Sequence, residues 1–406
     1  MVKVVKDCLS LLNLRMGDMQ SIATDNAAYC GKAYRLLKAE HPTLLWIRCA
    51  AHGFNLVLRA LCSPFQDVDD LVADLKAFFV KGFGLRRRIS SFEDRFKRSP
   101  LGIFCVTETR WSEWVKAVQW TSLNSKNLAA WMKDNGSSST ISNRIGDFLG
   151  SIDRVAALHA IAACTTELMQ LIVDTQGDPL TFLSGERGNL FLRIDAMRSF
   201  LQKLQDPEFA EAFVVASFLT HREEPGGSSF GEQFAAMGKE EKQAVVVMCS
   251  QGAIPACEKF DKHIRPTLDS LRVARYIVPA VACTMLGTLR ESSMPPAELC
   301  SSIQCPGVDA TFVNDWNIYV RTDLPAFLAL SEEDRPSAIS FWKSRIKSLP
   351  RLALFALRVL SLPLGTASAE RAFSKLRDVQ SPHRGSIGEQ YTKMELVLSF
   401  NKELLW

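Results

Sequence analysis

The sequence lacks any apolar run long enough to cross a lipid bilayer. Its longest apolar stretches, at 210–219 and 276–285, are well short of the roughly 20 residues that a membrane-spanning helix needs, and charged residues lie around both. The amino terminus also lacks a long hydrophobic region followed by a small-residue cleavage site, which a secretory signal would show. We therefore expect a protein that is not secreted and has no membrane partner.

The sequence also has no CxxC pair, although it has 11 cysteines. An odd number of cysteines without paired spacing, mostly inside apolar helical patterns, indicates reduced and buried thiols of an intracellular protein. Cys300 and Cys305 flank a short loop, but no second ligand pair lies near them in the sequence, which argues against a structural zinc site. No segment repeats at a fixed period, and this argues against a helical solenoid.

What is present is a long, apolar chain with unevenly placed charge. Its 406 residues are 47% hydrophobic and 23% charged, which is enough for two or three domains with a large core. The net charge of +4 hides two basic stretches, because residues 76–98 and residues 341–406 each carry a net charge of +6. Such stretches suit a phosphate-backbone partner, although solvated helix faces explain them equally well. The cations that we expect at a DNA-binding surface here are Lys81, Arg86, Arg87, Arg88, Arg95, Lys97 and Arg98.

The pattern of apolar residues predicts two short strands and two helices near the amino terminus. Residues 20–24 and 44–48 are typical of buried strands, and residues 26–39 and 52–61 are typical of amphipathic helices. This order implies two parallel strands joined by a helical crossover. After Pro64 the chain is expected to form helices separated by polar or glycine-rich breaks, at 134–140, 185–188, 223–231 and 292–296. The expected fold class is therefore α/β and predominantly helical.

Four short motifs follow one another along the chain. They are TDNAAYC at 24–30, RCAAHGFNL at 48–56, TRW at 109–111 and SAERAFSKL at 368–376. Together with the stretch from Phe341 to the final apolar helix, they resemble the hAT superfamily of DNA transposases. The resemblance runs from about Ser21 to Asn401. It implies a partial RNase H-like domain at 1–135, a large all-α insertion at 136–335 and a carboxy-terminal dimerisation region at 336–406.

The resemblance implies a catalytic site that works with metal ions. In the family three carboxylates hold divalent metal, Mg²⁺ or Mn²⁺, for strand cleavage and transfer. Asp25 matches the second of these carboxylates and Glu370 matches the third. Each residue also has a simpler interpretation, with Asp25 as a helix N-cap and Glu370 as an exposed glutamate in the first turn of a helix.

Three further residues carry the resemblance near the expected site. His52 lies in the second motif and is expected to orient neighbouring groups or approach DNA, whereas a core histidine satisfied by a backbone carbonyl is the alternative. Arg110 and Trp111 match an arginine-tryptophan pair of the family, and such a pair can stack on an extruded base. A core tryptophan at the start of a helix explains Trp111 equally well.

The carboxy-terminal helices predict self-association, because the last of them has an apolar surface too broad to be left in water. The expected partners are a second copy or a related transposase, together with DNA, in the nucleus, and no small-molecule substrate is expected. The residues that we expect at the dimer interface are Phe341, Trp342, Leu352, Phe355, Phe373, Tyr391, Met394 and Leu398.

The first carboxylate of the family set has no counterpart in this sequence. It should lie on a strand well upstream of Asp25, but only 24 residues precede Asp25, and their acids, Asp7 and Asp18, are not in such a strand. No amino-terminal zinc finger is found either. We therefore expect that the chain begins inside the fold and does not cleave DNA on its own. The alternatives are an active metal-dependent transposase, if the true product extends upstream, and a degenerate copy without function.

Overall fold

The computed structural model describes residues 2–11, 13–25, 27–80, 84–105, 111–136, 139–176, 190–220, 237–302, 305, 307–362 and 366. The chain forms two compact units. The first contains Met1–Ala51, Thr175–Arg187 and Asp269–Trp406, and the second contains His52–Asp174 and Gly188–Leu268. The first unit therefore combines the two ends of the chain, which a division in sequence order does not do.

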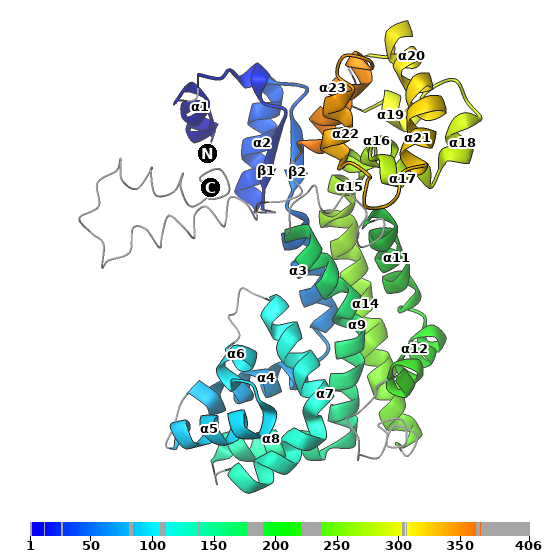
Figure 1. The fold of residues 1–406 in the computed structure, drawn as a ribbon. Coiled ribbons are helices and arrows are strands. Elements are labelled where there is room, and N and C mark those ends of the chain that lie inside the picture. Colours follow the sequence, from blue (N-terminus) through cyan, green and yellow to red (C-terminus); the bar gives the residue numbers. More distant parts are fainter. Residues whose placement is uncertain are drawn as a thin grey trace. The chain divides into compact units, whose positions relative to one another are not determined.

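In the first unit, a helix connects two short parallel strands (Figure 1). β1 (Ser21–Thr24) pairs with β2 (Leu45–Arg48), with Thr24 opposite Arg48, and α2 (Ala28–Glu40) makes the crossover. The face of α2 formed by Cys30, Ala33 and Leu37 is buried, as expected from a helical repeat of three to four residues. The predicted strands and crossover are thus confirmed. α1 (Val2–Leu11), which was not expected from the sequence, packs against α2, and η1 (Met16–Asp18) lies between α1 and β1.

The rest of the first unit is a set of short helices around one aromatic core. The core consists of side chains that are almost fully buried and in ring contact, namely Trp316, Tyr319, Phe341, Trp342, Phe312 and Phe355. The indole N–H of Trp342 donates to the carbonyl of Ile277 at 2.6 Å, and the hydroxyl of Tyr319 donates to the carbonyl of Tyr276 at 3.1 Å. The elements are α16 (Ala274–Ile277), α17 (Pro279–Cys283), α18 (Leu286–Arg290), α19 (Ala297–Cys300), α20 (Ala310–Ile318), the π-helix η2 (Tyr319–Asp323), α21 (Leu324–Leu328), α22 (Ala338–Ser344) and α23 (Pro350–Leu360).

The second unit is helical throughout its described part. Figure 1 shows α4 to α8 gathered together and the longer α9 and α14 running side by side. Its elements are α3 (Ala50–Cys62), α4 (Gln66–Val80), α5 (Leu85–Phe96), α6 (Pro100–Phe104), α7 (Trp111–Asn135), α8 (Thr140–Gly150), α9 (Ile152–Gln176), α11 (Leu190–Lys203), α12 (Pro207–Thr220), α14 (Lys239–His263) and α15 (Arg265–Leu271). A predominantly helical chain is therefore confirmed, and so are the helix breaks expected at 134–140 and 292–296. The expected breaks at 185–188 and 223–231 lie outside the described residues.

One helix of the described part, α9, is long and apolar enough to cross a membrane by length and composition alone. Its most apolar window has a mean hydropathy of 1.5, and 78% of that window is buried inside the protein. This stretch was missed among the apolar runs of the sequence. Burial among other helices explains the apolar composition, because a helix that is apolar on all sides can serve as the centre of a helical core.

Candidate functional site

The carboxyl ends of β1 and β2 form one edge of the small sheet. Asp25 directly follows β1, and Cys49 directly follows β2. The backbone N–H of Cys49 donates to the carbonyl of Thr24 at 2.9 Å, which continues the parallel pairing to the end of both strands. Ends of parallel strands are the usual place for ligand-binding side chains in α/β folds. Asp25 and Cys49, the second residues of the first two sequence motifs, therefore follow neighbouring strand ends.

The Asp25 carboxylate is held through one of its two oxygens. Its Oδ1 accepts the backbone N–H of Ala27 and the thiol of Cys30, both at 3.2 Å. Burial, and then the Asp25 carboxylate, raise the pKa of the Cys30 thiol above its ordinary value, so that Cys30 remains a proton donor to Asp25. Among the described residues Oδ2 has no hydrogen-bond partner, and Asp25 is half-buried. Asp25 does not occupy the N-cap position of α2, because that position is Ala27.

Thr24 and Trp46 fix the backbone on which Asp25 stands. The indole N–H of Trp46 donates to the hydroxyl of Thr24 at 2.9 Å, and this hydroxyl donates to the carbonyl of Asp25 at 2.8 Å. The Trp46 ring stacks on Tyr34, with 5.1 Å between ring centres, and the Arg48 guanidinium lies 4.4 Å from the Trp46 ring centre. These contacts restrict the rotation of the Trp46 ring and help to hold its N–H toward Thr24.

The carboxy-terminal part of the chain reaches the same edge. The backbone N–H of Thr366 contacts the Cys49 sulfur at 3.4 Å, and Thr366 precedes Glu370 by four residues in the sequence. Glu370 itself lies outside the described residues. Within the described part of the chain, no three His, Cys, Asp or Glu side chains form a group able to hold a metal ion. Asp25 alone does not make a two-metal centre, so no chemical step is assigned to metal here.

The other expected site residues lie elsewhere or are not described. His52 is a half-buried residue of α3 in the second unit. Trp111 is the first residue of α7, as expected for the start of a helix, but its side chain is not among those described. Arg110 and Lys81 lie outside the described residues.

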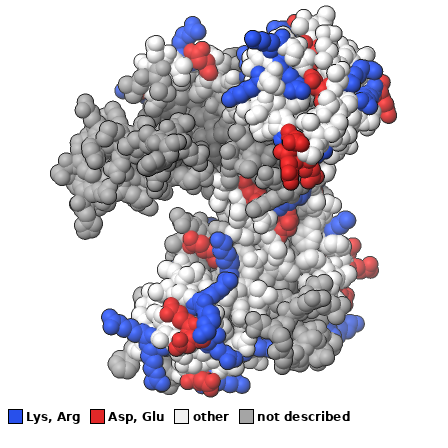
Figure 2. All heavy atoms as spheres, in the orientation of Figure 1, with Lys and Arg blue, Asp and Glu red and all other residues white. Residues whose placement is uncertain are grey.

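Five cations lie at exposed positions of α5 and of the turn after it. Arg86, Arg87, Arg95, Lys97 and Arg98 are exposed, and within the described residues none of them has an ion-pair partner. Figure 2 shows lysine and arginine side chains, with some acidic ones among them, over the region that Figure 1 labels α5. Arg86 and Arg87 are about 100° apart around α5, Arg95 is about 180° from Arg86, and the exposed acids Glu93 and Asp94 lie on the same helix. Cations without an ion-pair partner still attract an anionic partner.

The inner face of α5 rests on an aromatic core. Phe92 is fully buried and contacts Phe79, Phe104, Trp120 and Trp131, with ring centres 4.9 to 6.2 Å apart. Arg88 differs from the other predicted cations, because its guanidinium lies 4.3 Å from the ring centre of Phe78 and burial lowers its pKa. Arg88 therefore helps to fix α5, and the outer cations are carried on a rigid helix.

The predicted dimer contacts that the structure describes are core residues of their own unit. Phe341, Trp342, Leu352 and Phe355 are at most 1% exposed. Their side chains lie in the intramolecular core, whereas four apolar residues close to them in sequence are 40–50% exposed, namely Leu328, Leu330, Ile346 and Leu354. The remaining predicted contacts, Phe373, Tyr391, Met394 and Leu398, lie outside the described residues.

Two features were missed in the sequence. Cys30 bonds to Asp25, and its position near the start of the helix that follows the strand is the signal that could have suggested this contact. Lys126 and Lys133 line a cavity on α7, and their separation by two helical turns, with Ala129 and Ala130 between them, is a pattern visible in the sequence.

Comparison with known proteins gives one result for the carboxy-terminal part of the chain. Residues 327–401 match the hAT family C-terminal dimerisation region. No curated protein matches the chain. The matched segment includes α22, α23 and the stretch that follows Thr366 at the strand edge.

Proposed function

This chain is a hAT transposase-related protein with the family's dimerisation region, and from this premise we propose that it acts as a self-associating DNA-binding protein that does not cleave DNA on its own. Association with itself or with related hAT proteins follows from the matched region. DNA binding is the further step, and the exposed cations of α5 and of the turn after it, which have no ion-pair partner within the described residues, support it. A nuclear location fits both activities.

The surface of α5 is suited to the DNA backbone rather than to particular bases. Arg86, Arg87, Arg95, Lys97 and Arg98 are exposed, and Phe96, the aromatic residue between Arg95 and Lys97, is in ring contact with Phe92, Trp120 and Trp131. Contacts of lysine and arginine to phosphate position a protein on the duplex without carrying sequence information. We therefore propose non-sequence-specific DNA binding, dominated by the release of counterions.

The salt dependence of DNA binding tests this proposal. We expect the affinity of the full chain for an arbitrary duplex to fall steeply with salt, because each phosphate that the protein neutralises adds about 0.9 to the slope of log affinity against log salt concentration. The triple variant Arg86→Gln, Arg87→Gln, Arg95→Gln should bind more weakly, and its slope should be smaller by roughly one for each phosphate that it no longer neutralises. Fluorescence anisotropy at several salt concentrations measures both quantities.

The matched control is a lysine of the same unit far from α5 in sequence. Lys203 at the end of α11 is such a residue, and Lys203→Gln should leave affinity and slope unchanged. An affinity that does not depend on salt, or an equal loss in both variants, would contradict DNA binding through α5.

We expect no DNA cleavage because of the number of family-type carboxylates in this chain. Asp25 stands at the strand edge, Glu370 matches a second family carboxylate, and the sequence offers no counterpart of the first. Metal affinity depends on how many charged oxygen ligands converge, so a site with one ligand fewer should bind Mg²⁺ or Mn²⁺ weakly. We expect no metal-dependent nicking of a DNA hairpin by the purified chain. Nicking that Asp25→Asn abolishes and Glu333→Gln, a change in an exposed loop, leaves intact would overturn this expectation.

A further inference from the structure

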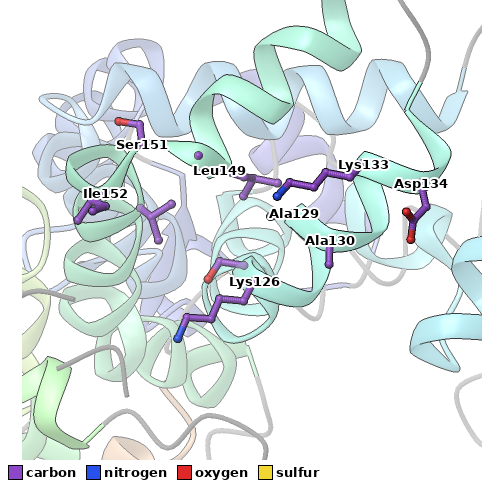
Figure 3. A pocket seen from close by; sticks show the side chains of 11 residues that line it. Lys126, Ala129, Ala130, Lys133, Asp134, Leu149, Ser151 and Ile152 are labelled. Carbon is purple, nitrogen blue, oxygen red and sulfur yellow. The ribbon is translucent and has the colours of Figure 1, made fainter. Parts of the chain in front are cut away.

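The second unit contains a cavity of about 440 Å³ beside α7 (Figure 3). One wall is the second half of α7, and the other is the corner where α8 ends and α9 begins. Its lining residues on α7 are Ser125, Lys126, Ala129, Ala130, Lys133 and Asp134, and those of the corner are Leu149, Gly150, Ser151, Ile152 and Val155. The volume falls in the range of sites that hold small organic ligands, about 300 to 1,000 Å³.

The cations of the cavity outnumber its one carboxylate. Lys126 and Lys133 lie two turns apart on one face of α7, about 10 Å along the helix. Lys133 is exposed and has no partner among the described residues, and Figure 3 shows its side chain extending toward Leu149 while Asp134 points in another direction. Asp153, in the first turn of α9, is already bonded to the Ser151 hydroxyl. The cavity therefore favours an anionic ligand.

Ser125 is the second observation that points to a ligand. Its side chain lines the cavity, the residue is only 5% exposed, and its hydroxyl has no hydrogen-bond partner within the described part of the chain. The hydroxyl oxygen is not among the fully buried polar atoms that lack a partner, so it is open to the cavity and available to a ligand there. A ligand oxygen in the cavity would accept the proton of this hydroxyl. Ser125 therefore adds a hydrogen-bond donor to the wall of the cavity that carries Lys126 and Lys133.

The rest of the lining is apolar. Ala129 and Ala130 present only methyl groups, and Leu149, Ile152 and Val155 provide aliphatic surface on the opposite wall. An inorganic ion alone would leave this surface uncovered, whereas an organic body attached to the anion would bury it. The start of the 25-residue helix α9 adds a partial positive charge at the same corner.

We propose that this cavity binds a small organic phosphate, with Lys133 and Ser125 contacting the phosphate oxygens and the aliphatic wall contacting the organic body. The site is separate from the α5 surface. Trp131 and Trp120 of α7 contact Phe92 of α5, and Lys133 lies two residues beyond Trp131, about 200° around the helix. Ligand binding here does not depend on the proposed DNA binding.

Adenosine monophosphate is a suitable probe, and adenosine is its neutral counterpart. Isothermal titration of the full chain should give saturable binding of adenosine monophosphate at one site and at least roughly tenfold weaker binding of adenosine. Lys133→Gln should lower the affinity for adenosine monophosphate about tenfold, as expected for loss of one charge-assisted hydrogen bond. Ser125→Ala should lower the same affinity by a smaller factor. Lys116→Gln, at an exposed position of α7 outside the cavity, should leave binding unchanged.

A short oligonucleotide with a 5′-phosphate distinguishes the two sources of such a group. Competition by the oligonucleotide as strong as that by adenosine monophosphate would assign the site to a DNA end, and competition by the free nucleotide alone would assign it to a metabolite. The proposal would be overturned if neither probe binds saturably. It would also be overturned if Lys133→Gln and Lys116→Gln lose the same amount of affinity for adenosine monophosphate. The affinity of Lys133→Gln for a duplex without 5′-phosphates should remain that of the unaltered protein.

Discussion

At the scale of single residues, Asp315 illustrates how a buried carboxylate joins distant parts of the chain. The residue is 2% exposed on α20, and its Oδ2 accepts the backbone N–H groups of Arg351 and Leu352 at 2.9 and 3.2 Å. These N–H groups lie in the first turn of α23, where a helix leaves its donors without partners of its own. Asp315 thus supplies from another helix the cap that Leu349, at the N-cap position, cannot supply.

Replacing Asp315 should destabilise the first unit. We expect Asp315→Ala to lower the free energy of unfolding by about 2 to 3 kcal/mol, because two buried donors lose a charged acceptor. Asp315→Asn keeps an acceptor oxygen and should cost less, and Glu332→Gln, at an exposed position, should change stability by about 0.5 kcal/mol or less. Urea unfolding measures all three. Equal stability of Asp315→Ala and Glu332→Gln would show that the cap contributes nothing.

Residue-level prediction from the sequence succeeded where chain order alone places a side chain. Asp25 follows a strand whose apolar run ends there, so its position at the strand edge could be predicted. The hydrogen bonds of Asp25 could not be predicted to the same extent, because the bond from Cys30 depends on the rotation of α2. Phe341 and Trp342 show the other limit. An apolar pattern indicates that one face of a helix is buried, but it does not indicate whether the same chain or a partner buries that face.

At the scale of elements, glycines decide how closely helices approach. A Cβ atom added to Gly252 on α14 would lie 2.2 Å from the backbone oxygen of Leu61 on α3, so the two helices are in contact through their backbones. Gly146 on α8 has nothing within 4 Å of the same position and is exposed. The same substitution is therefore forbidden sterically at one site and free at the other.

These two glycines give opposite predictions for one change. Gly252→Ala should destabilise the protein by about 1 to 3 kcal/mol or more, because a backbone must move to admit the methyl group. Gly146→Ala should stabilise it by up to about 1 kcal/mol through the higher helix propensity of alanine. Thermal unfolding of both variants checks the pair. A Gly252→Ala protein as stable as Gly146→Ala would mean that α3 and α14 do not pack closely.

Element boundaries were predicted best where breaks are strong. The polar and glycine-containing stretch at 134–140 separates α7 from α8, as expected, since no helix continues well through it. The short helices α16 to α19 were less accessible to prediction. Pro279 and the turns between these helices give local stops, but the core around Tyr319 and Trp342 decides their arrangement.

At the scale of the whole molecule, buried titratable groups make stability sensitive to alkaline pH. Burial raises the pKa of the Cys62 thiol well above its ordinary value of 9.0. A hydrogen bond with Cys249, together with burial, raises the pKa of the Cys164 thiol, and burial raises that of the Tyr319 phenol. Because these pKa values are raised in the folded state, the unfolded chain loses its protons first as pH increases. The stabilisation is complete below pH 9 and is lost progressively above it.

Denaturant unfolding between pH 7 and pH 10.5 tests this linkage. We expect the free energy of unfolding to be flat below about pH 9 and then to fall by as much as about 1.4 kcal/mol per pH unit for each group that keeps its proton. Cys62→Ala should make the fall shallower, and Tyr319→Phe should do so above pH 10. Substitution of the exposed Cys8 should not change the slope. A flat profile up to pH 10.5 would contradict the role of these buried groups.

The contact between Thr366 and Cys49 determines the order in which the protein can be completed during synthesis. Residues 52–268, which include the whole of the second unit, leave the ribosome before residues 269–366 of the first unit have been made. The small sheet and α2 therefore lack their contact with Thr366 until residue 366 has been synthesised. Domains commonly fold from the amino terminus onward. Here the amino-terminal segment gains its contact with Thr366 only after the second unit has been made, and Thr366 lies within the stretch matched to the dimerisation region.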